Sequence, residues 1–288
     1  MNIGTDYLGI KRDIMLNFRR LLLIALCSFL LTTTVCRANS TIEDTIDARY
    51  LLNEQTVMGI VWMRCSGEYR ALCYQAYNSA LRAVTSAVDN KSEDSKPLAF
   101  ILDCDETILD NSIYEGALVG TTDSYSIPSF SAWIREVRAD AMPGAVALLN
   151  KIDKLGVSIF YVSNREADTE AATIENLKRL GFPQADAYHV VFPNNKKDYN
   201  KESRQDEIAN EYEVIAYMGD SMTDFHLGLR GKSFIEAQKV ADDNAEEFGT
   251  KYIILPNPMY GSWESALHQG YSSMTAEEKN KVRKERLK

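Results

Sequence analysis

The sequence predicts an α/β protein: a doubly wound parallel sheet with a small cap insertion and an N-terminal helical segment. First, short continuous apolar runs such as LAFIL at 98–102 alternate with amphipathic helical patterns, which is typical of parallel strands covered by helices on both faces. Second, helical periodicity without intervening strands precedes the first of these runs, at 41–88. Third, a segment at about 111–142 interrupts the alternation and is long for a loop between a strand and its helix, so we expect it to form a lid or cap.

The N-terminus has the pattern of a secretory signal peptide at 1–38. A basic stretch is followed by an apolar run at 21–35, which is shorter than the about 20 residues that a membrane-spanning helix needs. Small residues follow at Cys36 and Ala38, as at a signal-peptide cleavage site. We therefore expect cleavage after Ala38 and a periplasmic or secreted protein, with Met15 as an alternative start.

A lipoprotein signal is the alternative interpretation of the same segment. Cys36 or Cys27 would then carry the lipid and tether the protein to the outer membrane. Val35 is bulky for the position directly before an acylated cysteine, which makes Cys36 a poor site. The sequence leaves both interpretations open.

The rest of the chain is predicted to contain a helical segment at 39–96, a core at 97–272 and a helical tail at 273–288. In the core, the predicted strands are the apolar runs at 98–103, 157–164, 187–192, 213–221 and 250–258. The predicted helices between them lie at 143–156, 168–181, 201–212 and 239–249. Typical capping residues such as Asp168 and Gly181 bound these helices. In the N-terminal helical segment, Gly59 and Ser66-Gly67 are candidate breaks.

Charge and cysteine content narrow the class of protein. The net charge of −9 argues against nucleic acid as a partner, because phosphate backbones are bound by basic surfaces. Three cysteines follow the signal segment, Cys65, Cys73 and Cys104. Their odd number argues against a disulfide framework, and we expect all three to be small buried apolar side chains.

Polar side chains follow the ends of several predicted strands. The residues concerned are Asp103 and Asp105, Ser163 and Asn164, Lys201, and Asp220 and Asp224. Because ligands of such sheets bind beyond the carboxyl ends of the strands, we expect these side chains to meet at one edge. Carboxylates gathered there need a hard cation, and Mg²⁺ prefers such oxygen ligands. A lysine and a hydroxyl beside them favour a phosphate dianion.

The pair Asp103 and Asp105 suits covalent phosphoryl transfer. One carboxylate can act as the nucleophile and form an aspartyl phosphate. The neighbour two residues on can protonate the leaving group and then activate water. The competing interpretation is that the acids merely cap the helices that follow each strand, which explains single acids but not the coordinated pattern.

The motif DCDET at 103–107 matches the DxDxT signature of the haloacid dehalogenase-like phosphatases. The segments that extend the resemblance are DETILDNSIYEG, PGAVALLN, FYVSNRE, TIENLKRLGFP, YMGDSMTDF and LPNPMYGSWESAL. In order, over about residues 50–270, the chain resembles the bacterial class C acid phosphatases, the nonspecific acid phosphatases and nucleotidases of the lipoprotein e type. The resemblance implies a secreted Mg²⁺-dependent enzyme that hydrolyses small phosphomonoesters, such as nucleoside 5'-monophosphates and aryl phosphates, and that forms a homodimer.

The resemblance also implies roles for the acids. Asp103 would be the nucleophile, and Asp105 the general acid and base. The Asp103 carboxylate, the backbone carbonyl of Asp105 and the Asp220 carboxylate would bind Mg²⁺. Asp224 would support this metal site.

Further roles follow from the same resemblance. Ser163 would bind the phosphoryl group, and Lys201, three residues before Arg204, would be the catalytic lysine. The segment before Lys201 is one residue shorter than the family pattern, so Lys197 is an alternative. Two aromatic residues would enclose the leaving group, and Asn164 at a strand tip completes the predicted substrate contacts; the aromatic residues are Trp133 and Tyr260.

A different class of protein fits part of this pattern. Receiver-type signalling modules also place acids, a hydroxyl and a lysine at strand tips and carry an aspartyl phosphate. They keep that phosphate and have no general acid two residues after the acceptor, so Asp105 argues for turnover. The signal peptide and the cap also fit poorly with a cytosolic switch. A binding homologue without turnover is a third alternative, and the intact acids argue against it.

Overall fold

The computed structural model describes residues 47–195 and 199–288. The described helices and strands lie within one unit, Ala48–Lys288. The predicted signal peptide, with its alternative start and its candidate acylation sites, lies outside the described residues and stays a prediction. The alternative catalytic lysine, Lys197, also lies outside them.

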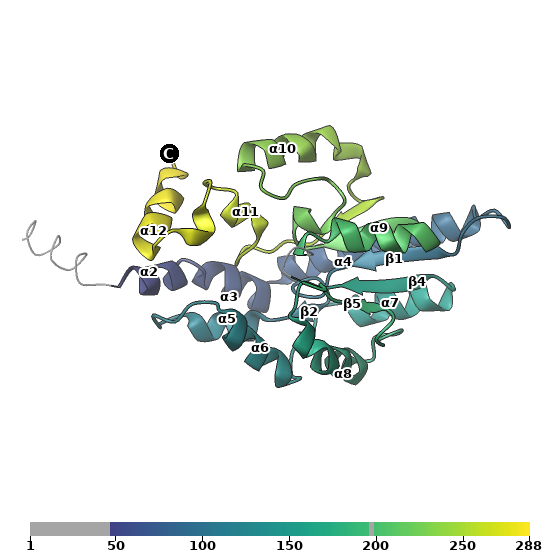
Figure 1. Cartoon of the computed structure of the whole chain (residues 1–288), viewed down its shortest axis with the longest axis horizontal. Coiled ribbons are helices and arrows are strands. Elements are labelled where there is room, and N and C mark those ends of the chain that lie inside the picture. Colours follow the sequence, from purple (N-terminus) through teal and green to yellow (C-terminus); the bar gives the residue numbers. More distant parts are fainter. Residues whose placement is uncertain (1–46, 196–198) are drawn as a thin grey trace, which may run out of the picture. The chain divides into compact units, whose positions relative to one another are not determined.

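Five parallel strands form the central sheet (Figure 1). They are β1 (Leu98–Leu102), β4 (Ser158–Val162), β5 (Val190–Val191), β6 (Glu213–Gly219) and β7 (Tyr252–Ile254), in the order β5-β4-β1-β6-β7. The chain runs from β1 outward to β4 and β5, and then returns to the other side of β1 for β6 and β7. This reversal beside β1 is the switch point at which such sheets bind ligands. The predicted doubly wound parallel sheet is confirmed.

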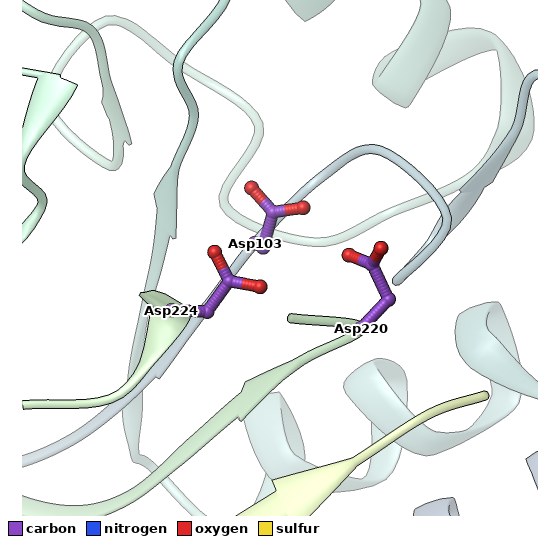
Figure 2. Close-up of side chains that lie close together, drawn as sticks. All are labelled: Asp103, Asp220 and Asp224. Atoms are coloured by element: carbon purple, nitrogen blue, oxygen red, sulfur yellow. The ribbon is translucent and has the colours of Figure 1, made fainter. Parts of the chain in front are cut away.

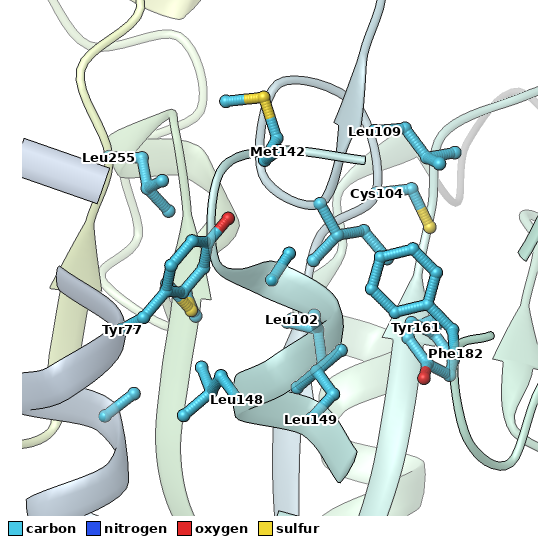
Figure 3. Close-up of a cluster of buried hydrophobic side chains, with 14 of the residues drawn as sticks. Tyr77, Leu102, Cys104, Leu109, Met142, Leu148, Leu149, Tyr161, Phe182 and Leu255 are labelled. Carbon is cyan, nitrogen blue, oxygen red and sulfur yellow. The ribbon is translucent and has the colours of Figure 1, made fainter. Parts of the chain in front are cut away.

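Helices cover both faces of the sheet. The flanking helices are α4 (Gly67–Asp89), α7 (Ala145–Lys154), α8 (Glu170–Leu180) and α9 (Glu202–Glu211). Phe100 and Leu102 of β1 pack with side chains of α4, α7 and α8 in one buried cluster. Figure 3 shows part of this cluster, with Leu102 labelled. Ala99 and Ile101 point to the opposite face and pack with Ile208 of α9. Because successive side chains of a strand alternate between faces and both faces are covered, every residue of β1 is buried.

Helices precede the sheet, as predicted, but the first break differs. The two helices before α4 are α2 (Ala48–Glu54) and α3 (Val57–Cys65). The predicted break at Gly59 is wrong, because Gly59 lies inside α3. A Cβ at this position would lie 3.2 Å from the carbonyl oxygen of Pro258, so glycine permits a close approach of the two segments. The break at Ser66 is present, and the Ser66 side chain caps α4 by accepting the Tyr69 N–H.

The cysteine prediction is confirmed in part. Cys73 and Cys104 are fully buried and free, as expected. Cys65 is exposed, so the expectation of burial is wrong there. It is the last residue of α3, where the helix ends and its periodic pattern no longer determines which side chains face the core.

The predicted cap is an insertion of short elements between β1 and α7. Its elements are β2 (Leu109–Asp110), α5 (Ser112–Leu118), α6 (Ile127–Arg135) and β3 (Asp140–Ala141). β2 pairs with β3 in antiparallel fashion, so the insertion leaves and re-enters the core at one place. Ser126 and Ser129 form a capping box that starts α6 before Pro128, which fixes the position at which this helix begins.

The C-terminal part differs most from the prediction. The helix expected at 239–249 is α10 (Phe234–Asp243), which starts earlier because Ser233 and Glu236 form a capping box. The remaining helices are α11 (Ser262–Ser265) and α12 (Ala276–Glu285). Across residues 47–195 and 199–288, no helix is both long and apolar enough to cross a membrane.

Candidate active site

Three aspartates meet at the carboxyl edge of the sheet (Figure 2). Asp103 follows β1, Asp220 follows β6, and Asp224 ends the 3₁₀ turn η3 (Met222–Asp224). One carboxylate oxygen from each residue lies within 4.8 Å of the other two. The pairing of β1 with β6 brings these residues together although they are far apart in the sequence. Of the three, Asp103 and Asp224 are buried.

The end of β6 is built to hold Asp224. Its Oδ2 atom accepts the backbone N–H of Ser221 at 3.0 Å, which closes a capping box over η3. A Cβ on Gly219 would lie 2.4 Å from the Asp224 side chain. Glycine at the last position of β6 therefore lets this carboxylate lie directly over the strand end.

Neutral donors hold the Asp220 carboxylate. The Thr107 hydroxyl, from the end of the DCDET motif, donates to Oδ1 at 3.2 Å. The Asn257 amide, which follows β7, donates to Oδ2 at 2.8 Å. The pKa of Asp220 is raised well above its ordinary value, by burial first and then by the charges of Asp224 and Asp103.

Lys201 supplies the positive charge of this cluster. It stands directly before α9, only 3% of its surface is exposed, and its ammonium contacts Asp103 Oδ1 and, at 2.9 Å, Asp224 Oδ1. Burial by itself lowers the pKa of Lys201, but the two carboxylates outweigh burial and raise it, so the lysine stays charged. Burial raises the pKa of Asp103 to about 7 despite this lysine, and Asp224 and Asp105 add to the rise.

The cluster suits a hard divalent cation. Its donor atoms are all carboxylate oxygens, the ligands that such cations prefer. The cluster holds three carboxylates and one lysine, which pairs with Asp103 and Asp224. Burial raises the pKa values of Asp103 and Asp220, and the neighbouring carboxylates raise them further. Positive charge added at this point would relieve that repulsion, so the residues fit a metal ion in both chemistry and charge.

Asp105 stands in different surroundings. Its side chain is 18% exposed and forms a salt bridge with Arg165, whose Nη2 lies 2.7 Å from Oδ1. The Arg165 Nε atom lies 3.1 Å from both carboxylate oxygens. The Asn111 amide also donates to Oδ1, at 2.8 Å. Asp105 is thus held by a guanidinium and an amide, and it does not share the lysine of Asp103.

Glu106 follows Asp105 directly, in the turn that leaves β1. It is fully buried, and its backbone has a φ of +54°, a left-handed conformation that is uncommon for a side chain of this size. Its carboxylate accepts the backbone N–H of Asn111 at 2.8 Å and the hydroxyl of Tyr260. Burial raises the pKa of Glu106 well above its ordinary value. These bonds fasten the DCDET turn to the loop after β7.

The predicted substrate residues lie around these acids. Ser163, after β4, is fully buried, and its hydroxyl accepts the backbone N–H of Arg165 at 3.1 Å. Asn164 is exposed, and its amide donates to the Tyr199 carbonyl at 3.1 Å. Trp133 of α6 is buried and donates its indole N–H to Asn111 Oδ1 at 2.8 Å. Tyr260 points its hydroxyl to the buried Glu106 of the DCDET turn, whereas Trp133 is linked to this turn through Asn111, which donates to Asp105 and Glu106.

Sequence reasoning missed several residues of the site. The residues that hold the acids without having been predicted are Arg165, Asn111, Thr107 and Asn257. Two of them carried a usable signal, because Arg165 lies two residues after Ser163 at a strand tip and Thr107 closes the DxDxT motif. Asn111 and Asn257 lie in loops, and nothing in their spacing indicates which acid each one contacts.

The comparison with family models decides the class of protein. The model of the HAD superfamily, subfamily IIIB (acid phosphatase), matches residues 28–263. The chain belongs to this family. The resemblance seen in the sequence is thereby confirmed, and so, at the level of the family, is the predicted class of enzyme, a phosphomonoesterase.

Individual relatives agree with this membership. The class C acid phosphatase from Bacillus anthracis is 37% identical, with a TM-score of 0.78 over 82% of this chain and 98% of that one. The class C acid phosphatase from Bacillus anthracis with tungstate bound is 36% identical, with a TM-score of 0.77 over the same shares of the two chains. The Stem 28 kDa glycoprotein from Glycine max is 25% identical over 166 residues, 56% of this chain and 59% of that protein. The chain therefore spans less than two thirds of this curated relative.

Proposed function

We propose that this protein is a secreted Mg²⁺-dependent acid phosphatase that hydrolyses phosphomonoesters through an aspartyl phosphate on Asp103. The observation that carries the proposal is the contrast between two carboxylates of one motif. Asp103 lies buried between Lys201 and two further carboxylates, while Asp105, two residues on, lies partly exposed against Arg165. One is suited to attack phosphorus beside a cation, and the other to exchange protons.

In the first step, a carboxylate oxygen of Asp103 attacks the phosphorus atom of the ester. The bond between phosphorus and the leaving-group oxygen breaks, and its electron pair stays on that oxygen. Asp105 donates a proton to the same oxygen, so the product leaves as a neutral alcohol. The charged Lys201 beside Asp103 stabilises the negative charge of the phosphoryl group during the attack.

In the second step, water attacks the phosphorus atom of the aspartyl phosphate. Asp105, now a carboxylate, takes a proton from this water, and the bond between phosphorus and the Asp103 oxygen breaks. Phosphate leaves, Asp103 is again a carboxylate and Asp105 is again protonated. Ser163, buried at the adjacent strand tip, is proposed to bind the phosphoryl oxygens through its hydroxyl.

The metal would be held by Asp103, Asp220 and the backbone carbonyl of Asp105, with Asp224 supporting them. A bound Mg²⁺ would neutralise charge on the phosphoryl oxygens and shield the nucleophile from the neighbouring carboxylates. The tungstate in the Bacillus anthracis relative supports an oxyanion site in the family, since tungstate is an oxyanion like phosphate.

The proposed substrates are small phosphomonoesters, among them nucleoside 5'-monophosphates and aryl phosphates. Trp133 and Tyr260 are proposed to border the leaving group together with Asn164. Trp133 is linked to Asp105 by hydrogen bonds through Asn111. Tyr260 bonds Glu106, the residue after Asp105, and Asn164 directly follows Ser163. The proposed location is periplasmic or extracellular, as the signal-peptide pattern indicates.

Release of phosphate from p-nitrophenyl phosphate and 5'-AMP tests the proposal. We expect turnover at acid pH with Mg²⁺, loss of turnover with EDTA, and no turnover by Asp103→Asn in either condition. The alternative is a protein that accepts a phosphoryl group and keeps it. In that case labelled phosphate stays on the wild-type chain, and no free phosphate accumulates beyond one equivalent.

A further inference from the structure

The Asp105 carboxylate is bonded asymmetrically. Its Oδ1 atom accepts two short hydrogen bonds, from Arg165 Nη2 at 2.7 Å and from Asn111 Nδ2 at 2.8 Å. Among the described residues, the only hydrogen-bond partner of Oδ2 is Arg165 Nε, at 3.1 Å, and this N–H is shared with Oδ1. The two oxygens therefore differ in how tightly the protein holds them, and Oδ2 has capacity left for another group.

Arg165 is itself held rigidly. Its side chain is 2% exposed, and Nη1 donates to the buried hydroxyl of Thr173, in α8, at 3.0 Å. Its backbone N–H donates to the Ser163 hydroxyl at 3.1 Å. The guanidinium thus has one position fixed by the tip of β4 and by α8, and its flat fork of donors fixes the plane of the carboxylate that it binds.

Asn111 is held from three directions. Its Oδ1 accepts the indole N–H of Trp133 at 2.8 Å, and its backbone N–H donates to Glu106 at 2.8 Å. Its Nδ2 donates to Asp105 at 2.8 Å and to Glu106 at 3.3 Å. The tryptophan donor determines which end of the amide faces Asp105, because an indole N–H can only donate.

Both arms of this arrangement touch the cap helix α6. Trp133 contacts Asn111, and the Phe130 ring lies 5.9 Å from the Arg165 guanidinium carbon. Phe130 and Trp133 are three residues apart in α6 and so lie on one face of the helix. A displacement of α6 would therefore reach Asp105 from both sides at once.

We propose that Arg165 and Asn111 are positioning residues that aim Asp105 Oδ2 at the leaving-group oxygen, and that α6 of the cap sets their position. The inference rests on the proposed function. It assigns Oδ2 as the atom that gives its proton to the leaving-group oxygen while the ester bond to phosphorus breaks and the bond to Asp103 forms. Oδ1 stays anchored throughout.

A series of esters with different leaving groups tests this assignment. Protonation matters most for a strongly basic leaving group and hardly at all for a weakly basic one. We expect Arg165→Lys, which keeps the charge but loses the fork of donors, to lower kcat/KM about 100-fold on phenyl phosphate and less than about threefold on 2,4-dinitrophenyl phosphate. The ratio kcat/KM is the relevant quantity because it covers the steps from free enzyme and ester up to departure of the leaving group, and not the later attack of water.

Trp133→Phe provides a second variant that keeps an aromatic ring and removes only the N–H donor. We expect about tenfold loss on phenyl phosphate and less than about twofold on 2,4-dinitrophenyl phosphate, because Asn111 loses its anchor. Arg135→Lys is the control for Arg165→Lys, since Arg135 lies in the same helix as Trp133 and pairs with the exposed Asp168. Trp62→Phe, in which the ring packs on Tyr69, is the control for Trp133→Phe. Both controls should match wild type on both esters.

Each outcome has a separate meaning. A loss that is equal on both esters, or no loss, in folded Arg165→Lys and Trp133→Phe overturns the positioning proposal while the phosphatase itself stands. If Arg165→Lys does not fold, as judged by circular dichroism, Trp133→Phe decides alone. No phosphate release by wild type from either ester overturns the proposed function and the positioning proposal together.

Discussion

The two aspartates of the DCDET motif are separated by one residue, yet they stand in opposite surroundings. Asp103 is buried among carboxylates and shares one lysine with Asp224. Asp105 is partly exposed and faces a guanidinium and an amide. A strand that ends at Leu102 and a turn that follows directly send the two side chains into these different regions.

The difference teaches that charge balance, and not residue type, separates the roles. On the Asp103 side, negative charge exceeds positive charge, which attracts a cation and favours a nucleophile that works beside one. On the Asp105 side, the carboxylate is matched by a buried arginine and one oxygen remains available. Chemistry that needs both a nucleophile and a proton carrier can therefore be built from two identical side chains.

The largest expected effect separates the two aspartates by the step that each variant blocks. With 2,4-dinitrophenyl phosphate, we expect Asp105→Asn to release about one equivalent of 2,4-dinitrophenol rapidly and then to stop, because the attacking water lacks its general base. Asp103→Asn should release none, with a loss on the order of 10⁴-fold or more, because no aspartyl phosphate can form. Rapid-quench measurement of phenol and of protein-bound phosphate checks both.

Two results would contradict this assignment. A burst of phenol from Asp103→Asn would mean that another group is the nucleophile. Steady turnover of the activated ester by Asp105→Asn would remove Asp105 from the second step. Asp123→Asn, in the exposed part of the cap before α6, is a matched control that should behave like wild type.

The metal side should respond most to Asp220. Loss of a residue that hydrogen-bonds a metal ligand typically weakens metal binding by roughly 10–100-fold. We expect Asp220→Asn, which alters a proposed ligand itself, to raise the Mg²⁺ concentration for half-maximal activity by more than that. Asn257→Ala, which removes the donor at 2.8 Å from Asp220, should fall within that range. Activity titrations with Mg²⁺ rank the two variants, and equal requirements in Asp220→Asn and wild type would remove Asp220 from the metal shell.

Lys201→Met tests the charge balance through stability. Removing this buried lysine leaves Asp103 and Asp224 without their cation, which should lower the free energy of unfolding by about 3–5 kcal/mol in EDTA. Mg²⁺ should raise the Tm of the variant more than that of wild type, since it replaces the missing charge. The control is Lys239→Met, whose exposed pair with Asp243 contributes about 0.3–0.5 kcal/mol. Equal stability losses in the two variants would contradict the importance of the buried cluster.

Sequence patterns predicted the acid side of this comparison well. The apolar runs at 98–103 and 213–221 marked the two strands, and parallel strands place their carboxyl ends at one edge. The meeting of Asp103, Asp220 and Asp224 therefore followed from topology alone. The helix predicted at 239–249 begins at Phe234 instead, because Ser233 and Glu236 form a capping box that the apolar pattern does not indicate.

The opposite side could not be predicted in the same way. The contacts of Asp105 come from the cap, where Asn111 stands in a loop and Trp133 in a short helix. No periodic pattern specifies how an insertion folds back on the core. The hydrogen-bond partners of Trp133 and Tyr260 therefore could not be predicted from the sequence. The left-handed Glu106, buried against Tyr260, was also hidden, because nothing in the letters DET indicates a positive φ.

The smallest expected effect concerns Glu115, in α5 of the cap. Burial, with the charge of Glu264 in addition, raises the pKa of Glu115 from 4.5 to about 7. A carboxyl group whose pKa is raised by folding stabilises the fold fully below the unfolded value, and that contribution is lost as pH rises through the folded value. The cap should therefore be more stable at pH 5 than at pH 8.

Glu115→Gln should increase the free energy of unfolding by about 1–3 kcal/mol at pH 8 and change it little at pH 5. Thermal unfolding at the two pH values checks this, with the exposed Glu175→Gln of α8 as the control. A stability gain that is the same at both pH values would show that Glu115 does not titrate between them.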